Sequence, residues 1–229
     1  MAELHLVAPD LWVTTIPHRF IGLHIGTRMT VIRLASGALV LHSPVPISEA
    51  LRQEIEAIGP VRHIICPNLF HHMYTSDTCA AFPEAQLHGP QKLQRKRKDL
   101  KFDAVLSDIP HPDWQGQLLP LTVEGSMLHE TLFYHPASKT LISCDLVENF
   151  SHCDHAPTRW YLRAGGIFGK VGWHPLLRMV YLNRRKARQS IEQLFEWPFE
   201  QVIVAHGDVI TENAREAVRG GLAWLRLDG

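Results

Sequence analysis

Three hydrophobic runs of this chain each lead to side chains that can bind a metal ion. The first run continues through a short stretch, residues 67–70, to the adjacent pair His71 and His72. The second run leads to Asp145 and the third ends directly on His206. Buried strands that end on such residues place reactive side chains at one rim of a rigid scaffold. The order of these residues therefore predicts a metal site at a rim where several strands end.

The residue types in this set are those that a catalytic metal ion requires. A catalytic zinc ion takes three protein ligands and keeps one position open for a water molecule, whose pKa it lowers to about 7. His71 or His72, together with Asp145 and His206, would supply three ligands. We therefore expect one metal ion as a cofactor, with zinc as the first candidate and iron or manganese as alternatives.

The same side chains also have an ordinary structural interpretation, which the sequence leaves open. His71 and His72 could cap the helix that follows them, and adjacent side chains on an extended strand point to opposite faces. Asp145 could accept hydrogen bonds from backbone N–H groups, and His206 could satisfy buried polar groups. Under this interpretation the protein binds no metal ion at all.

Four further polar side chains are candidates for contacts with a substrate or with the metal ligands. Asn68 stands at the start of the stretch that leads to the His pair. His88 ends a short predicted strand and is expected near the same rim, although a packed imidazole is the simpler interpretation. His152 and His155 belong to the run His-Cys-Asp-His at 152–155, which is dense in ligand types but is also typical of an exposed loop. The sequence does not identify a catalytic residue.

The elements that must position these groups are predicted from hydrophobic periodicity and turn residues. The predicted strands are 11–16, 29–34, 38–42, 63–66, 85–88, 117–123, 129–134, 140–144 and 201–205. The predicted helices are 48–58, 75–82, 183–197 and 213–227, and the stretch 147–175 has an irregular pattern. Because hairpins occur in both halves and no linker or repeat is visible, we expect one domain, 1–229, in which helices cover mixed sheets.

Composition limits the classes of partner. The chain has 229 residues, of which 45% are hydrophobic and 20% charged, and its formal net charge is zero. We therefore expect a small-molecule substrate or ligand and no nucleic acid, and we interpret the basic run 92–101 as a solvated face. No apolar stretch reaches the roughly 18 residues of a transmembrane segment, and the first residues do not resemble a secretory signal. The four cysteines form no Cys-x-x-Cys pair, which favours a cytoplasmic protein with reduced thiols.

Several segments resemble the metallo-β-lactamase superfamily in their order along the chain. The hairpin 29–43 resembles its opening strands, 140–146 its hairpin with the metal-bridging Asp, and 202–207 its final strand with the last His ligand. This resemblance extends from about residue 11 to residue 206. It implies an α/β (α+β) fold, a four-layer αββα sandwich, with the site at one edge between the sheets. It also implies that Asp145 and His206 are ligands, and His71 or His72 more loosely.

The chain departs from the superfamily at its most specific motif. The motif His-x-His-x-Asp-His follows a strand, whereas here the strand is followed by Asn-Leu-Phe-His-His-Met at 68–73. The acidic residue that orients or deprotonates the attacking water is missing, and Ser43 stands where an Asp often follows the second strand. The resemblance implies a divergent metal-dependent hydrolase-like protein of unknown substrate, in which metal-activated water attacks an ester, amide, thioester or phosphoester. The alternative is a non-catalytic protein of the same fold that binds a ligand or partner without a functional metal centre.

Overall fold

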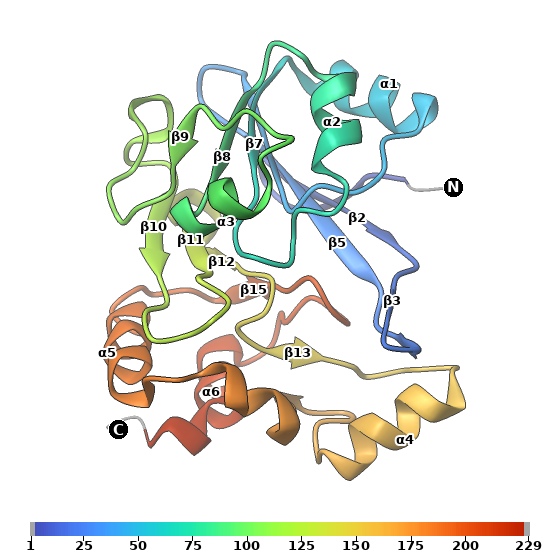
Figure 1. Ribbon diagram of the computed structural model, residues 1–229, viewed down its shortest axis with the longest axis vertical. Coiled ribbons are helices and arrows are strands. Elements are labelled where there is room, and N and C mark those ends of the chain that lie inside the picture. The colour runs from blue at the N-terminus through green and yellow to red at the C-terminus, as the bar shows by residue number, and fades with distance from the viewer. Residues whose placement is uncertain (1–2, 227–229) are drawn as a thin grey trace.

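The structure, a computed structural model that describes residues 3–226, contains two β-sheets packed face to face (Figure 1). In spatial order the first sheet contains β1 (His5–Ala8), β2 (Leu11–Ile16), β5 (Thr27–Arg33), β6 (Leu39–His42), β7 (Val61–Ile65), β8 (Gln86–Gly89) and β9 (Ala104–Val105). The second sheet contains β10 (Leu119–Thr122), β11 (Thr131–His135), β12 (Thr140–Ile142) and β15 (Gln201–Ile203). Two short ribbons pair β3 (Arg19–Phe20) with β4 (Leu23–His24), and β13 (Glu148–Asn149) with β14 (Val171–Gly172).

Helices cover the outer face of each sheet, so the predicted four-layer αββα sandwich is confirmed (Figure 1). The helices are α1 (Glu49–Ile58), α2 (Thr75–Ala81), α3 (Gln91–Lys96), α4 (Ala156–Ala164), α5 (Arg184–Leu194) and α6 (Ala214–Gly221). Four 3₁₀ turns complete the order: η1 (Pro112–Trp114), η2 (Pro136–Ser138), η3 (Pro175–Val180) and η4 (Ala223–Leu225). Residues 1, 2 and 227–229, which the predicted domain and the predicted helix 213–227 include, lie outside the described residues.

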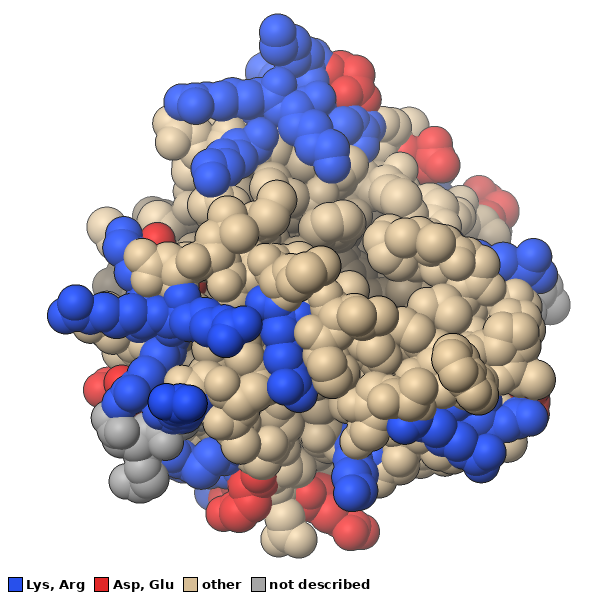
Figure 2. All heavy atoms as spheres, turned by 60° about the horizontal axis from the view of Figure 1, so that its bottom comes forward, with Lys and Arg blue, Asp and Glu red and all other residues tan. Residues whose placement is uncertain are grey.

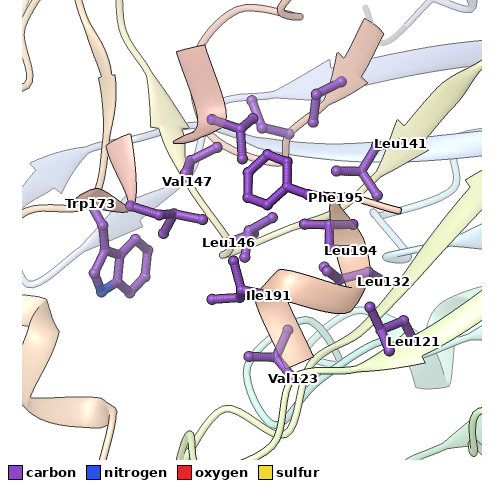
Figure 3. Close-up of a cluster of buried hydrophobic side chains, with 14 of the residues drawn as sticks. Leu121, Val123, Leu132, Leu141, Leu146, Val147, Trp173, Ile191, Leu194 and Phe195 are labelled. Carbon is purple, nitrogen blue, oxygen red and sulfur yellow. The ribbon is translucent and has the colours of Figure 1, made fainter. Parts of the chain in front are cut away.

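The alternation of side chains along the strands separates three layers of core. In β6, Leu39 and Leu41 pack outward against α1, whereas Val40 packs between the sheets. This is the period of two that a strand imposes on its side chains. Across the sandwich, α5 and the residue after it pack on the second sheet, and Figure 3 shows Leu194 and Phe195 within this cluster. Because both faces of the central strands are buried, the strand ends form a rigid rim.

Local sequence signals place most helices, with one omission. The Ser48 hydroxyl accepts a hydrogen bond from Leu51 N at 3.2 Å and so begins α1, as predicted from its type. The Asn183 side chain accepts from Lys186 N at 3.1 Å and begins α5, which ends three residues before the predicted boundary. The stretch 147–175, predicted as irregular, contains α4 and the ribbon β13–β14.

Parallel pairing brings four strand ends to one rim. β6 pairs with β7 in parallel, and β12 pairs with the edge strand β15 in parallel, so each sheet has one pair of strands that end in the same direction. The carboxyl ends of parallel strands are where open α/β sheets place their binding sites. No helix within residues 3–226 is both long enough and apolar enough to cross a membrane.

Candidate metal centre

Three side chains that follow these strand ends meet at the rim. His71 follows β7, Asp145 follows β12 and His206 follows β15, and all three are buried. Asp145 Oδ2 lies 3.4 Å from His71 Nε2, and Asp145 Oδ1 lies 3.3 Å from His206 Nε2. The three ligand atoms all lie within 4.8 Å of one another. We call these three residues the Asp145 group.

The donor set and its surroundings fit a divalent metal ion. Two ligands of a tetrahedral zinc ion with bonds of 2.0–2.1 Å lie about 3.3 Å apart, close to the separations found here. His206 Nδ1 donates to the Gly26 carbonyl oxygen at 2.8 Å, which leaves Nε2 to face Asp145. His71 Nδ1 lies 2.8 Å from Ser43 Oγ, which leaves Nε2 facing Asp145 in the same way. Metal-binding imidazoles are oriented by such bonds on their other nitrogen.

The electrostatics of the group also favour a cation. Burial alone would raise the pKa of Asp145, but the facing imidazoles of His71 and His206 hold that pKa well below its usual range. Burial alone would lower the pKa of His206, but the hydrogen bond and the charge of Asp145 raise it. The carboxylate is therefore stabilised in its ionised form by positive charge at the position where its neighbours converge.

Asn68 connects the His loop to the second sheet. Its Nδ2 donates to Asp145 Oδ2 at 2.7 Å, and its Oδ1 accepts from Phe70 N and His71 N at 2.8 Å each. One amide therefore fixes both the carboxylate and the backbone that carries His71. This places Asn68 beside the Asp145 group, where the sequence suggested a contact with the ligands.

Replacing Asn68 with Ala is expected to lower the metal affinity of the protein about 10- to 100-fold, because the variant loses the bonds that orient Asp145 and His71. The measurement is competition for Zn²⁺ against a coloured chelator. The matched control is Asn183→Ala, which removes the α5 cap and costs about 1 kcal/mol of stability without touching the site. Equal zinc affinity in the two variants would contradict this role for Asn68.

The structure does not bring His72 into the Asp145 group. His72 Nδ1 lies 2.9 Å from the Arg97 guanidinium and Nε2 lies 3.2 Å from Lys96 Nζ. Burial, with these two cations beside it, lowers the pKa of His72 to about 4. Lys96 and Arg97 belong to the basic run that was predicted to face solvent. They instead contact His72 and so hold the His loop against α3.

The other three candidates also lie outside the group. His88 pairs with His63 in the first sheet, where the two ring nitrogens are 3.1 Å apart. His152 pairs with Asp154 at 2.8 Å, and 78% of its side chain is exposed. His155 bonds Thr158 and stacks on a second imidazole 3.7 Å away, at the start of α4. None of these three lines the cavity beside the Asp145 group.

That cavity has a volume of about 530 Å³ and adjoins Asp145 and His206. Most of its lining side chains are apolar or aromatic. They include Phe20, Ile21, Leu23, Ile25, Phe70, Met73, Leu128, Tyr161, Trp173, Leu176, Leu177 and Val180. Among residues 3–226, no Lys or Arg lines the cavity. Figure 2 shows one face of the molecule on which Lys and Arg gather in separate groups around a mostly uncharged surface.

Two acidic residues near the group have no counterpart in the sequence predictions. Glu148, in β13, is 6% exposed and lines the cavity, and its Oε2 has no hydrogen-bond partner within the described part of the chain. Burial raises the pKa of Glu148 to about 7. Glu130 accepts from Cys144 N and Asp145 N and so holds the backbone of the ligand. The one signal for Glu148 is that it is the lone acid in the run Leu-Val-Glu-Asn-Phe at 146–150.

Comparisons with known proteins agree with this architecture. The profile of a family described as "Domain of unknown function (DUF4336)" matches residues 10–158, which include His71, Asp145 and Glu148 but not His206. No curated protein matches the sequence. A metallo-β-lactamase from Pontibacter korlensis is 14% identical, with a TM-score of 0.70 and 100% of both chains covered.

Two further solved structures extend this likeness. A metallo-β-lactamase from Pseudomonas aeruginosa in its mono-zinc form is 11% identical, with a TM-score of 0.66, over 98% of this chain and 95% of that one. A metal-soaked flavodiiron core from Synechocystis is 13% identical, with a TM-score of 0.67, over 98% of this chain and 61% of that one. At these identities the likeness concerns the fold alone.

Proposed function

Because the chain belongs to the family described as Domain of unknown function (DUF4336) and has the metallo-β-lactamase fold, we propose that it is a divergent metal-dependent hydrolase. The observation that carries this proposal is the convergence of His71, Asp145 and His206 beside a cavity large enough for a small molecule. The four cysteines, none of which is in a disulfide, support a proposed location in the reducing cytoplasm.

The Asp145 group would hold one divalent ion, with zinc, iron and manganese as candidates. Such an ion supplies Lewis acidity, which polarises a substrate oxygen and acidifies a water molecule. The other steps fall to the side chains of the chain. Ser43 and Gly26 engage the Nδ1 atoms of His71 and His206, so the Nε2 atom of each imidazole faces Asp145 and would be the atom that binds the ion. Asn68 holds the carboxylate in place.

Glu148 is the side chain best placed to accept a proton. Glu148 lines the cavity, its Oε2 has no hydrogen-bond partner among residues 3–226, and burial raises its pKa to about 7, which suits a general base at neutral pH. The acidic residue of the superfamily's His loop is missing here, so Glu148 would supply the carboxylate from the opposite side, on β13. In the proposed site, Glu148 thereby takes the place of the acidic residue that the altered His loop lacks.

The cavity favours a substrate with an apolar group next to a neutral bond. Its walls are apolar, and Ile21 and Met73 are exposed by 88% and 53% beside it. A phosphoester would bring negative charge next to Asp145 and Glu148 with no Lys or Arg from residues 3–226 to balance it. An ester, thioester or amide that carries an acyl or aromatic group is the chemistry that this lining supports.

The test is hydrolysis of p-nitrophenyl esters of increasing acyl length by metal-stripped protein before and after reconstitution with Zn²⁺, Fe²⁺ or Mn²⁺. We expect turnover to need the metal, to increase with acyl length and to fall at least about 100-fold in Glu148→Gln. Full turnover in Glu148→Gln would reject the assigned base. Binding of the products without turnover in any metal form would reject the enzyme and favour the non-catalytic alternative.

Glu148→Gln is also expected to change the pH dependence of stability. The pKa of Glu148 is raised in the folded protein from 4.5 to about 7, so the folded state loses stability as pH rises from about 4.5 to 7. This pKa rise of about 2.5 corresponds to at most about 3 kcal/mol. Metal-free Glu148→Gln should therefore be the more stable protein above pH 7, by up to that amount, and about equal to wild type near pH 4. Urea denaturation at several pH values, with exposed Glu196→Gln as the control, measures this difference.

A further inference from the structure

A second group of metal-binding side chains lies beside the edge strand β9 and shares no residue with the Asp145 group. His63 of β7 and His88 of β8 alternate with outward-facing apolar residues and so project between the sheets. His111 and Asp113 come from the start of η1. The rings of the three imidazoles lie 4.9, 5.0 and 4.8 Å from the ring of Trp114. We call His63, His88, His111 and Asp113 the His63 group.

The ligand atoms of this group converge as they do in the first site. His63 Nε2 lies 3.2 Å from Asp113 Oδ2, and His111 Nδ1 lies 3.7 Å from the same oxygen. One atom from each of these three residues lies within 4.8 Å of the other two. The spacing is again near the roughly 3.3 Å that separates two ligands of tetrahedral zinc.

The nitrogen of His63 is close to the carboxylate but is not bonded to it. Nε2 is buried, and although it lies 3.2 Å from Asp113 Oδ2 it makes no hydrogen bond of good geometry with any described residue. A buried polar atom without a partner is costly, and such atoms are uncommon in folded proteins. His63 Nε2 and Asp113 Oδ2 can both bind a metal ion, and because they lie close together without a good hydrogen bond, an ion can bind between them.

His88 sets the tautomer that this ion requires. His63 Nδ1 lies 3.1 Å from His88 Nε2, so a proton on Nδ1 can be donated to His88. The lone pair of His63 is then on Nε2, toward Asp113 and His111. The same relation holds for His206, whose Nδ1 donates to a carbonyl oxygen. In both groups a buried imidazole therefore presents its outer nitrogen toward a carboxylate.

Charge and access are both compatible with binding. Burial lowers the pKa of His63 to about 4 and that of His88 to about 3, so both imidazoles are neutral at pH 7. A cavity of about 80 Å³, lined by His88, His111 and Trp114, adjoins the group, and 56% of the Asp113 side chain is exposed. His111 Nδ1 accepts a hydrogen bond from Asp113 N at 3.3 Å, which is long. On binding an ion, the Nδ1 lone pair would leave this N–H group for the ion.

We propose that the His63 group binds a divalent transition-metal ion of the zinc type, with His63, His111 and Asp113 as ligands and His88 as the residue that orients His63. The ion ties the irregular segment 103–118 to the centre of the first sheet. Its role is to stabilise this edge, because the adjoining cavity is too small for the apolar substrates proposed for the first site.

The experiment measures zinc in untagged Asp145→Asn protein that has been stripped with a chelator and then reconstituted with Zn²⁺. Elemental analysis is expected to find about one zinc ion per chain, held by the His63 group. Adding His111→Gln and Asp113→Asn is expected to remove it. The same pair of substitutions in the wild-type background should lower the zinc content by one ion per chain, which covers the case that Asp145→Asn fails to fold.

The matched control is the double variant His152→Gln and Asp154→Asn. These residues have the same His-x-Asp spacing and lie 2.8 Å apart, but they are exposed by 78% and 94% and belong to no group of three ligands formed by residues 3–226. This control should keep all its zinc. Absence of zinc from Asp145→Asn protein, or zinc that survives His111→Gln with Asp113→Asn, would overturn the proposal. The readout needs no turnover, so failure of the proposed hydrolase would leave this result intact.

Discussion

Replacing Asp145 with Asn is expected to abolish tight metal binding at the rim and to lower metal-dependent turnover at least about 100-fold. Asp145 is the only member of its group that carries negative charge, and it faces the imidazoles of His71 and His206 at 3.4 and 3.3 Å. Asn keeps the shape of the side chain but offers a neutral amide, which is a poor ligand for zinc. Elemental analysis and ester turnover, measured on the same reconstituted sample, check both parts.

The control for this substitution is Asp154→Asn, because 94% of that side chain is exposed and it lies outside the Asp145 group. It should keep the metal content and turnover of the wild type. An Asp145→Asn variant that keeps both would contradict the proposed ligand set. A variant that keeps its first-site metal but loses turnover would show that Asp145 acts in a way other than ligation.

Replacing Gly207 with Ala is expected to destabilise the protein by about 3 kcal/mol or more. Gly207 directly follows His206 and has φ +88°, and a Cβ there would overlap the carbonyl oxygen of Asn149. That oxygen cannot withdraw easily, because it accepts from Asp208 N at 2.6 Å. The Gly207 carbonyl is itself held by Arg28 at 2.7 Å. Urea denaturation measures the loss, and zinc affinity should fall as His206 is displaced.

Gly37→Ala separates the effect of close packing from that of backbone conformation. Gly37 has φ +83°, nearly the same as Gly207, but a Cβ there would meet nothing within 4 Å. At this turn only the left-handed backbone conformation disfavours Ala, so Gly37→Ala is expected to lower the free energy of unfolding by about 1 kcal/mol. If both variants lost the same stability, the approach of Asn149 would not be the cause.

The layers of the fold and part of the candidate site could be predicted from the sequence. The hairpin in the first half, the Ser48 cap and the alternation of strands with helices are local signals, and they predicted mixed sheets covered by helices, whereas the αββα sandwich needed the superfamily resemblance. Asp145 and His206 could be selected because each closely follows a buried strand, and strand ends of equal direction share a rim. The pair His71 and His72 could be selected in the same way, without a choice between them, whereas Asn68 needed the superfamily resemblance as well.

Other parts depend on contacts between distant segments. Nothing local decides which of two adjacent imidazoles faces the site, and His72 is turned away by Lys96 and Arg97 of the distant α3 region. His88 does end a strand, but its strand lies near the far edge of the first sheet, so it meets His63 instead. Glu148 belongs to a two-residue ribbon whose partner follows more than twenty residues later, which periodicity cannot detect.

The Asp145 group draws His71 from the first sheet and its other two members from the second sheet. His206 follows β15, the last strand within residues 3–226, whereas His71 is made much earlier. A ribosome therefore completes the coordination set only near the end of the described chain. When the first half of the chain emerges alone, it contributes only the His71 imidazole to the Asp145 group and cannot chelate an ion there. The ion proposed for the Asp145 group can therefore be held only after both halves have been synthesised and docked.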